Sequence, residues 1–221
     1  MRKFVLIAIL SLPMLALGQN RVTNGSFESG LTGWTLGGTV DSYSAVVINY
    51  NLNAGYPASA FGEAVAPDNS GNISPDLAGA KAAYFVSDFS SQTLSQTVHL
   101  TPGTYQIGFS AYATNNGYSN PRDGQFTGSI AGVTLANYSI SSSSAATWQE
   151  FSGQKLVATE GDYIVQFSFL TNGSGAAKDV VIDRVYVVAA APVPEPETYA
   201  MLLCGLGLMG AVTRRRMNRK S

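Results

Sequence analysis

Short alternating stretches between residues 19 and 190 constrain the fold more than any other feature of the sequence. Nearly every apolar stretch there is rich in Val, Ile, Tyr, Phe and Thr and is bounded by Gly, Asn, Pro or Asp. This pattern is typical of β-strands, whereas the apolar spacing of an amphipathic helix is close to absent. The expected strands cover residues 45–49, 82–88, 94–100, 105–113, 125–130, 148–151, 163–170 and 180–188.

The clearest strand, residues 105–113, separates two kinds of side chain by strict alternation. One predicted face holds Tyr105, Ile107, Phe109 and Ala111. The opposite face holds Gln106, Gly108, Ser110 and Tyr112. In the strand at residues 163–170, Gln166 and Ser168 lie opposite the apolar positions.

Two turns that lead into these strands share one pattern, in residues 101–110 and 159–168. We expect Gly103 and Gly161 to supply unusual turn angles, and Tyr105 and Tyr163 to anchor each new strand in the core. A pattern seen twice does not make a repeat array.

Many short strands, regular turn signals and no helices predict an all-β fold. About one domain's length of chain is present between residues 19 and 190. The expected architecture is a single antiparallel β-sandwich of jelly-roll type.

The first residues predict export. Arg2 and Lys3 precede an apolar run that extends to Leu17 and ends in small residues at Ala16 and Gly18. This pattern is typical of a cleaved secretory signal peptide, assigned here to residues 1–18. The folded ectodomain is then expected at residues 19–190.

Residues 191–221 combine three unlike elements. A Pro-Glu-Pro sequence lies within residues 193–197, an uncharged and mostly apolar segment follows at residues 198–213, and basic residues gather in residues 214–221. The middle segment is long enough for a short transmembrane helix whose flanking arginines snorkel and stay in the cytoplasm.

The order of these elements resembles the PEP-CTERM sorting tail of Gram-negative bacteria. The resemblance implies export through the Sec machinery, a transient stop in the inner membrane and recognition by an exosortase. Release or attachment at the cell surface or in the extracellular matrix would follow, and such tails accompany extracellular polysaccharide and biofilm. The residues that carry the signal are Pro194, Glu195, Pro196, Arg214, Arg215 and Arg216.

Removing both ends leaves an acidic body. Lys plus Arg falls from 13 to 6 and Asp plus Glu from 14 to 12, which gives a formal charge of about −6. This charge argues against nucleic acid as a partner. The single cysteine, Cys204, lies in the tail, so the body contains no disulfide.

Scattered motifs of the body resemble galactose-binding-like carbohydrate-binding modules. They are the opening Asn24-Gly25-Ser26-Phe27-Glu28, a strand from Trp148 to Phe151, and the closing Ile182-Asp183-Arg184-Val185. The resemblance implies a β-sandwich and one structural calcium held by Glu28 and Asp183. The alternative is that Glu28 caps a turn while Asp183 pairs with Lys178 or Arg184.

A sugar-binding surface needs aromatic faces together with amides and hydroxyls. The candidate ligand-binding residues are Gln106, Ser110, Tyr112, Tyr118 and Gln166, with the loop at residues 114–124 closing over one edge. If their strands are neighbours in one sheet, they line a shared polar surface. The alternative is an ordinary solvated sheet face. Trp34 and Trp148 are expected in the core.

The sequence offers little for catalysis. His99 is the only histidine, no acid or nucleophile is patterned around it, and none of the common catalytic motifs is present. We therefore expect a non-catalytic exported protein that associates with extracellular polysaccharide. The alternatives are a purely structural surface or matrix protein and, last, a glycan-active enzyme.

Overall fold

The computed structural model describes residues 18–41, 43–171, 173, 175–190, 204–206 and 209–210. The chain separates into two units, Met1–Ala190 and Ala191–Ser221. We call the described part of the first unit the body. The expected signal peptide at residues 1–18 lies outside the described residues except for Gly18.

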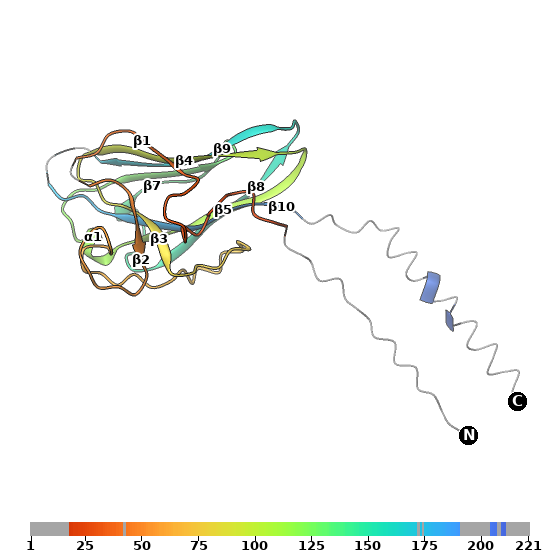
Figure 1. Ribbon diagram of the computed structural model, residues 1–221, viewed down its shortest axis with the longest axis horizontal. Helices are drawn as coiled ribbons and strands as arrows, with labels where there is room; N and C mark the ends of the chain where they lie inside the picture. The colour runs from red at the N-terminus through yellow and green to blue at the C-terminus, as the bar shows by residue number, and fades with distance from the viewer. Residues whose placement is uncertain are drawn as a thin grey trace, which may run out of the picture. The chain divides into compact units, whose positions relative to one another are not determined.

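The body consists of two antiparallel five-stranded sheets that face one another as two layers (Figure 1). Sheet A has the strand order β1-β4-β9-β6-β7, and sheet B has the order β2-β3-β10-β5-β8. The strands of sheet A are β1 (Thr35–Gly37), β4 (Ser90–Leu100), β9 (Gly161–Thr171), β6 (Gln125–Ile130) and β7 (Val133–Ser139). Those of sheet B are β2 (Val46–Asn49), β3 (Lys81–Phe85), β10 (Val180–Ala189), β5 (Gly103–Ala113) and β8 (Trp148–Val157). The expected all-β sandwich is confirmed.

The expected strands are present, with differences at their ends. β6 has the expected bounds, whereas β8 continues six residues beyond the expected end at Phe151 because it pairs with β5 along its whole length. β1 and β7 were not expected, since both are edge strands in Gly-, Ser- and Asn-rich sequence. Two short helical turns, α1 (Asn115–Tyr118) and η1 (Ile140–Ser142), were not expected either.

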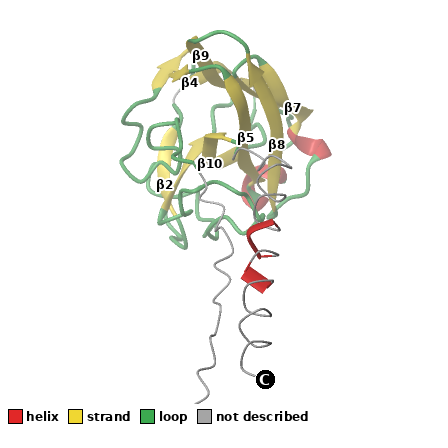
Figure 2. Ribbon diagram, turned by 90° about the vertical axis from the view of Figure 1, so that its right-hand side faces the viewer, coloured by secondary structure: helices red, strands yellow, loops and turns green. Residues whose placement is uncertain are grey.

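A central core fills the space between the two sheets. Figure 2 shows the two sheets in a view turned by 90° from that of Figure 1. It contains the predicted inward face of β5 and the phenylalanines of β6 and β9, and Phe109 meets Phe167 edge-on at 4.9 Å. Trp34 packs here against Phe27 and Phe167 as expected. Complementary aromatic packing of this kind, added to the area buried, holds the two layers together.

A second apolar cluster, which we call the outer cluster, lies on the other side of sheet B. Residues 51–80, the orange and yellow trace along the lower side of Figure 1, pass over this outer face. The members of the outer cluster are Ile48, Tyr50, Ala60, Val65, Ala82, Tyr84, Val86, Tyr112, Trp148 and Val181. The β3 and β10 strands of sheet B are therefore buried on both faces, and Trp148 is in a core as expected.

The two similar turns form similar corners. The Tyr105 hydroxyl donates to the carbonyl of Thr101 at 3.1 Å, and the Tyr163 hydroxyl donates to that of Thr159 at 2.9 Å. The expectation for the glycines was wrong at one corner, because Gly161 does not have a positive φ.

Candidate functional site

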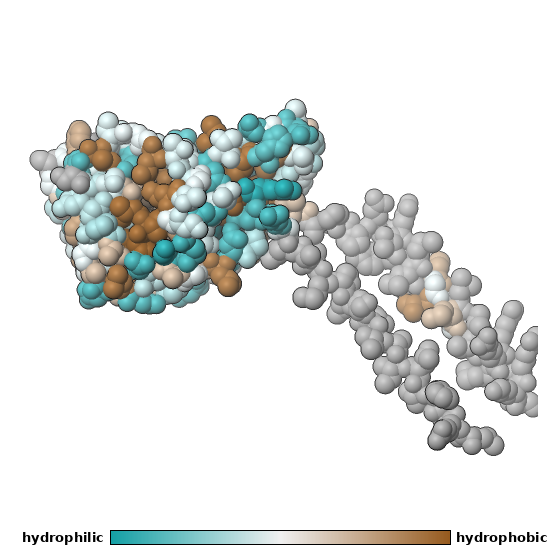
Figure 3. Space-filling model, in the orientation of Figure 1, coloured by the Kyte–Doolittle hydropathy of each residue, from teal (hydrophilic) through white to brown (hydrophobic). Residues whose placement is uncertain are grey.

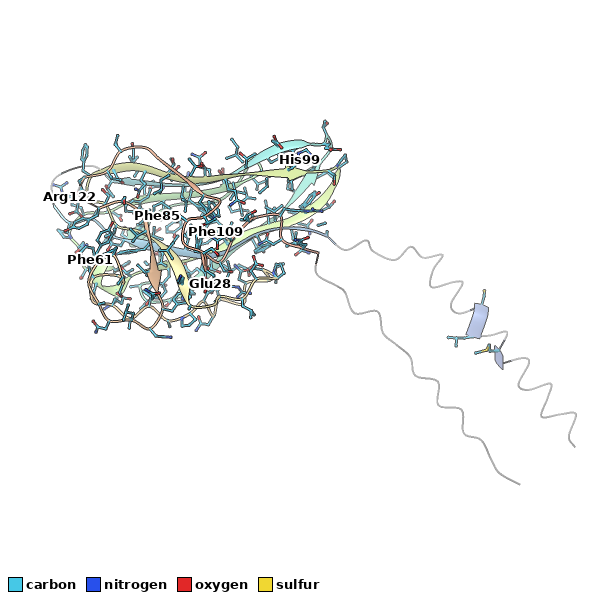
Figure 4. The ribbon with its side chains drawn as sticks, in the orientation of Figure 1. Glu28, Phe61, Phe85, His99, Phe109 and Arg122 are labelled. Atoms are coloured by element: carbon cyan, nitrogen blue, oxygen red, sulfur yellow. The ribbon has the colours of Figure 1, made fainter. Side chains whose placement is uncertain are left out.

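One end of sheet B brings together chain segments that are far apart in sequence. Val180, at the start of β10, lies between Phe85 at the end of β3 and Ala113 at the end of β5. The segments that continue from these strands, together with α1 and the turn at residues 59–63, surround a pocket of about 250 Å³. Figure 4 places Phe61 at this end and His99 at the other. The lining residues are Tyr43, Phe61, Val86, Asp88, Asn116, Gly117, Asn120, Ala176 and Asp179.

The aromatic side of the pocket is a group of three rings. Tyr43 meets Tyr56 and Phe61 edge-on at 5.0 and 5.3 Å between centroids, and Tyr56 stacks on Phe61 at 5.7 Å. Phe61 nevertheless keeps 42% of its surface exposed. The exposed part of the Phe61 ring is therefore accessible to a ligand without any rearrangement of the surrounding structure.

The backbone at Phe61 is in an uncommon conformation. Its φ is 45°, in the left-handed region that bulky residues seldom occupy, and Gly62 follows with a φ of 89°. Ser59 fixes this turn, since its hydroxyl donates to the carbonyl of Glu63 at 2.7 Å. Backbone conformations that are energetically unfavourable in this way are found most often at functional sites.

Two asparagines on and beside α1 form the amide side of the pocket. The Asn116 side-chain amide donates to the carbonyl of Phe61 at 3.2 Å, and that of Asn120 donates to the carbonyl of Ala177 at 2.6 Å. Within the described part of the chain, no donor reaches either side-chain oxygen.

Asp179 forms the floor of the pocket. It is buried, it accepts a 2.5 Å hydrogen bond from the hydroxyl of Tyr84, and Gly117 leaves it room, because a Cβ there would lie 2.6 Å from its Oδ2. Burial raises the pKa of Asp179 to about 7, and the charges of Asp88 and Glu63 add to this effect while the Tyr84 hydrogen bond opposes it.

Glu63 supports the pocket wall from behind. It accepts from the Tyr112 hydroxyl at 2.8 Å and from the backbone amide of Asn116 at 2.7 Å. This carboxylate thus connects the turn that carries Phe61 to β5 and to α1. Tyr112 is itself buried in the outer cluster, and its role in the pocket is through Glu63.

The other candidate ligand-binding residues are not brought together. Gln106 is half-buried on β5 of sheet B, while Gln166 is on β9 of sheet A, so the expected shared surface does not form. Ser110 is fully buried, with hydrogen bonds to Ser70 and Asn72 from the covering segment. Tyr118 donates to the carbonyl of Ser141 at 2.8 Å and lies outside the pocket lining.

The two carboxylates expected to hold calcium each have protein partners. Glu28 accepts from the amides of Ala80 and Lys81, both at 2.8 Å. Asp183 is fully buried and accepts from the Tyr50 hydroxyl at 2.5 Å and from the Arg184 amide at 2.7 Å. Asp183 thus pairs with the Arg184 backbone, whereas the Arg184 side chain lies 3.7 Å from Asp68 and the Lys178 side chain donates to the carbonyl of Asn120.

These contacts resemble the alternative in which both carboxylates are structural. In the described residues there is no group of three or more His, Cys, Asp or Glu that could hold a metal ion. The calcium site stays a prediction, which thermal unfolding of the purified protein with calcium and with a chelator tests.

His99 has acidic neighbours that the sequence pattern did not indicate. At the far end of sheet A, its Nδ1 lies 2.8 Å from Asp162 and its Nε2 lies 3.1 Å from Glu160. β4 and β9 pair in a register that sets His99 opposite Asp162, so residues 63 positions apart become neighbours. All three side chains are exposed.

Sequence reasoning missed Tyr43, Phe61, Asp88 and Asp179. The available signal was an aromatic residue before a glycine in the turn at residues 59–63, and acids that border strands at Asp88 and Asp179. Asn116 and Asn120 belong to the loop at residues 114–124, which was expected to close over an edge.

Comparison with known proteins identifies the tail. Residues 192–216 match the family model described as the PEP-CTERM protein-sorting motif. The chain carries a PEP-CTERM sorting motif. The PEP-CTERM motif marks an exported protein that is transiently anchored in a membrane, and all six expected signal residues, from Pro194 to Arg216, lie within the match.

The structure adds little about the PEP-CTERM tail itself. The predicted transmembrane segment at residues 198–213 lies mostly outside the described residues. In the parts of the chain that the structure covers, no helix is long and apolar enough to cross a membrane.

Several solved structures resemble the body. The carbohydrate-binding module TmCBM61 in complex with β-1,4-galactotriose has 20% identity and a TM-score of 0.49, over 78% of this chain and 99% of that one. The CBM22-1 xylan-binding domain of Paenibacillus barcinonensis Xyn10C has 14% identity and a TM-score of 0.41, over 79% and 97%.

An enzyme is also among the similar structures. The enzymatically active domain of tailspike protein 4 of bacteriophage CBA120 has 16% identity and a TM-score of 0.46, over 77% of this chain and 21% of that one. These similarities concern the arrangement of strands only. The search of curated protein sequences found no match to this chain.

Proposed function

We propose that this protein is a non-catalytic saccharide-binding protein of the cell surface or extracellular matrix. Its PEP-CTERM tail is the substrate of an exosortase after export through the Sec machinery, and its body holds extracellular polysaccharide. The observation that carries the binding proposal is the half-exposed Phe61 ring beside two asparagine oxygens and the carboxylates of Asp88 and Asp179.

Sugars require this combination of groups. A pyranose ring has C–H surfaces that pack on an aromatic face and hydroxyls that need hydrogen-bond partners. Phe61 and Tyr43 offer the faces, and Asn116 and Asn120 offer acceptors that their own backbone anchors hold in place. The pocket volume of about 250 Å³ suits one sugar unit of a longer chain, which would extend into solvent on both sides.

The test is retention of the purified protein on immobilised polysaccharides, including the exopolysaccharide of its own source. Phe61→Ala should weaken retention about tenfold or more, because the stacked face is lost. Phe89→Ala is the matched control, since Phe89 exposes 60% of its surface outside the pocket lining.

Equal loss in the two variants would contradict the pocket as the binding site. If the unaltered protein is retained on no polysaccharide, the body serves as a structural surface component instead. Release of reducing ends from any bound polysaccharide would contradict the non-catalytic part of the proposal.

A further inference from the structure

The pocket presents hydrogen-bond acceptors and negative charge. Asp88 and Asp179 line it, and Glu63 lies behind Asn116. None of the lining residues is a Lys or an Arg. Across the described residues, no ion pair involves any of these three carboxylates.

The nearest basic residue in sequence is engaged elsewhere. Lys178 precedes Asp179, but its Nζ donates to the carbonyl of Tyr118 and, at 3.0 Å, to that of Asn120. It also lies 4.7 Å from the centroid of the Tyr118 ring. Lys178 therefore stabilises the loop around α1 and does not line the pocket.

The amide groups add to these acceptors. Asn116 and Asn120 each use one side-chain N–H to bind a backbone carbonyl, which leaves the amide oxygen and the second N–H of each side chain. Beside the carboxylates of Asp88 and Asp179, the matching ligand group is one with several donors and a positive charge. A protonated amine has three N–H donors and no acceptor.

The aromatic wall favours an organic cation over a metal ion. An ammonium next to the faces of Tyr43 and Phe61 gains a cation–π attraction. Calcium instead needs six to eight oxygen ligands, and rings cannot supply them. A sugar ring that carries an amino group satisfies the aromatic face, the acceptors and the carboxylates together.

A bound cation would also relieve an unfavourable arrangement. The repulsion among Asp179, Asp88 and Glu63 contributes to the raised pKa of Asp179, after its burial. A positive group within hydrogen-bonding distance reverses that repulsion, and charge-assisted hydrogen bonds are about twice as strong as neutral ones.

We propose that this pocket selects a sugar unit with a free, protonated amino group over N-acetylated, neutral and acidic sugars. The proposal rests on the proposed function, because it names the class of sugar for the same pocket. N-acetylation removes the charge and two of the three donors, and a uronic acid places a like charge beside Asp88 and Asp179.

The experiment is isothermal titration of the purified protein with short β-1,4-linked oligomers at pH 7, because a more acidic buffer would protonate Asp179, whose pKa is about 7. The probes are oligomers of glucosamine, of N-acetylglucosamine, of galactose and of galacturonic acid. The glucosamine oligomer should bind about tenfold tighter than its N-acetylated form. The galacturonic acid oligomer should bind most weakly.

Two variants separate the pocket from the overall acidity of the protein. Asp88→Asn should reduce the tenfold preference for the glucosamine oligomer over its N-acetylated form to about one. Asp162→Asn removes the same charge at the opposite end, beside His99, and should leave the preference unchanged.

The outcomes separate this inference from the proposed function. Equal affinity for the glucosamine and N-acetylglucosamine oligomers, with binding that Phe61→Ala abolishes, overturns the amino-sugar selectivity and leaves the saccharide site intact. An equal effect of Asp162→Asn and Asp88→Asn also overturns it, because the attraction would then come from net charge. Absence of binding to every probe and every polysaccharide overturns both.

Discussion

The outer faces of the two sheets of this sandwich differ in what covers them. That of sheet B carries the outer cluster under residues 51–80, whereas that of sheet A carries a polar surface. The pairing of β4, β9 and β6 aligns Thr93, Ser168 and Thr127 in one row and Ser95, Gln166 and Ser129 in the next. The covering of sheet B also produces the candidate site, because the covering segment supplies Phe61 and Glu63.

The difference follows from the strands themselves. β10 is apolar at nearly every position from Val180 to Val188, as expected for a strand buried on both faces. β9 alternates, with the buried Val165, Phe167 and Phe169 toward the core. The other side carries Gln166 and Ser168 together with the exposed Ile164 and Leu170. To bury its outer face, sheet B needs an additional segment of chain to cover it. The loop between β2 and β3 is long enough to supply that segment.

Polar residues are also distributed unevenly. Figure 3 shows hydrophilic residues gathered at one end of the body and a larger hydrophobic area toward the middle of the same face. The hydrogen bonds that join Asp183 to Tyr50 and Asp179 to Tyr84 are buried, while His99 and its two acids are exposed.

Of the proposed substitutions, Trp148→Ala is expected to have the largest effect on the free energy of unfolding. It tests whether the covered face of sheet B contributes to stability. Trp148 contacts Tyr50 and Tyr112 and donates to the carbonyl of Ala66 at 2.8 Å, so it connects sheet B to its cover. Its removal should reduce the free energy of unfolding by about 3–5 kcal/mol in urea titrations.

The matched change on the other sheet is Gln166→Ala, at the centre of the polar face of sheet A. It should change the free energy of unfolding by no more than about 0.5 kcal/mol. Similar losses in both variants would mean that the two faces do not differ as described.

Asp183→Asn should change how the free energy of unfolding depends on pH. Burial raises the pKa of Asp183 from 3.8 to about 9, the charge of Asp68 adds to this, and the hydrogen bonds from Tyr50 and Arg184 oppose it. Between these two pH values the folded chain holds a proton that the unfolded chain has released. The free energy of unfolding should therefore fall as pH rises, by up to about 1.4 kcal/mol per pH unit.

Chemical denaturation at several pH values across that window measures the slope. Asn is close in shape to a protonated Asp. Its oxygen can accept from the Arg184 amide while its N–H donates to the Tyr50 hydroxyl, so the variant should fold and show a flatter profile. An unchanged slope in Asp183→Asn would show that this carboxyl does not carry the dependence.

His99→Gln should give the smallest effect, because the group is fully exposed. Hydrogen bonds to Asp162 and then Glu160 raise the pKa of His99 above 6.5. Its contribution to stability is complete below pH 6.5 and is lost as pH rises through the folded value. Titration of the His99 ring protons by NMR measures that value, and thermal unfolding of His99→Gln should shift less than that of Asp183→Asn.

A pKa of His99 at or below 6.5 would contradict the pairing with the two acids. The exposed end would then contribute no pH dependence of its own, and the contrast with the covered sheet would become sharper.

Much of the fold could be predicted from the sequence because alternation is a local property. The inward faces of β5 and β9, the bounds of β6 and the tyrosine corners all depend on residues close together in the chain. The PEP-CTERM tail could also be recognised, because three unlike elements follow one another in a fixed order.

The candidate site could not be predicted in the same way. Periodicity places Gln106 and Gln166 on faces of strands, but it does not say which strands share a sheet, and β5 and β9 do not. It also assigned Ser110 and Tyr112 to a polar surface, since nothing local indicates that residues 51–80 fold over that face.

The sequence by itself determined the strand composition, the acidic body and the PEP-CTERM sorting motif, because each depends on side chains that act near their own position in the chain. Only the tertiary structure brought the candidate site together. Phe61, Asn116 and Asp179 are separated by more than fifty residues, and they meet where β3 and β5 end beside the start of β10. Pairing between distant strands is set by the packing of the whole sandwich, and no short stretch of sequence encodes it.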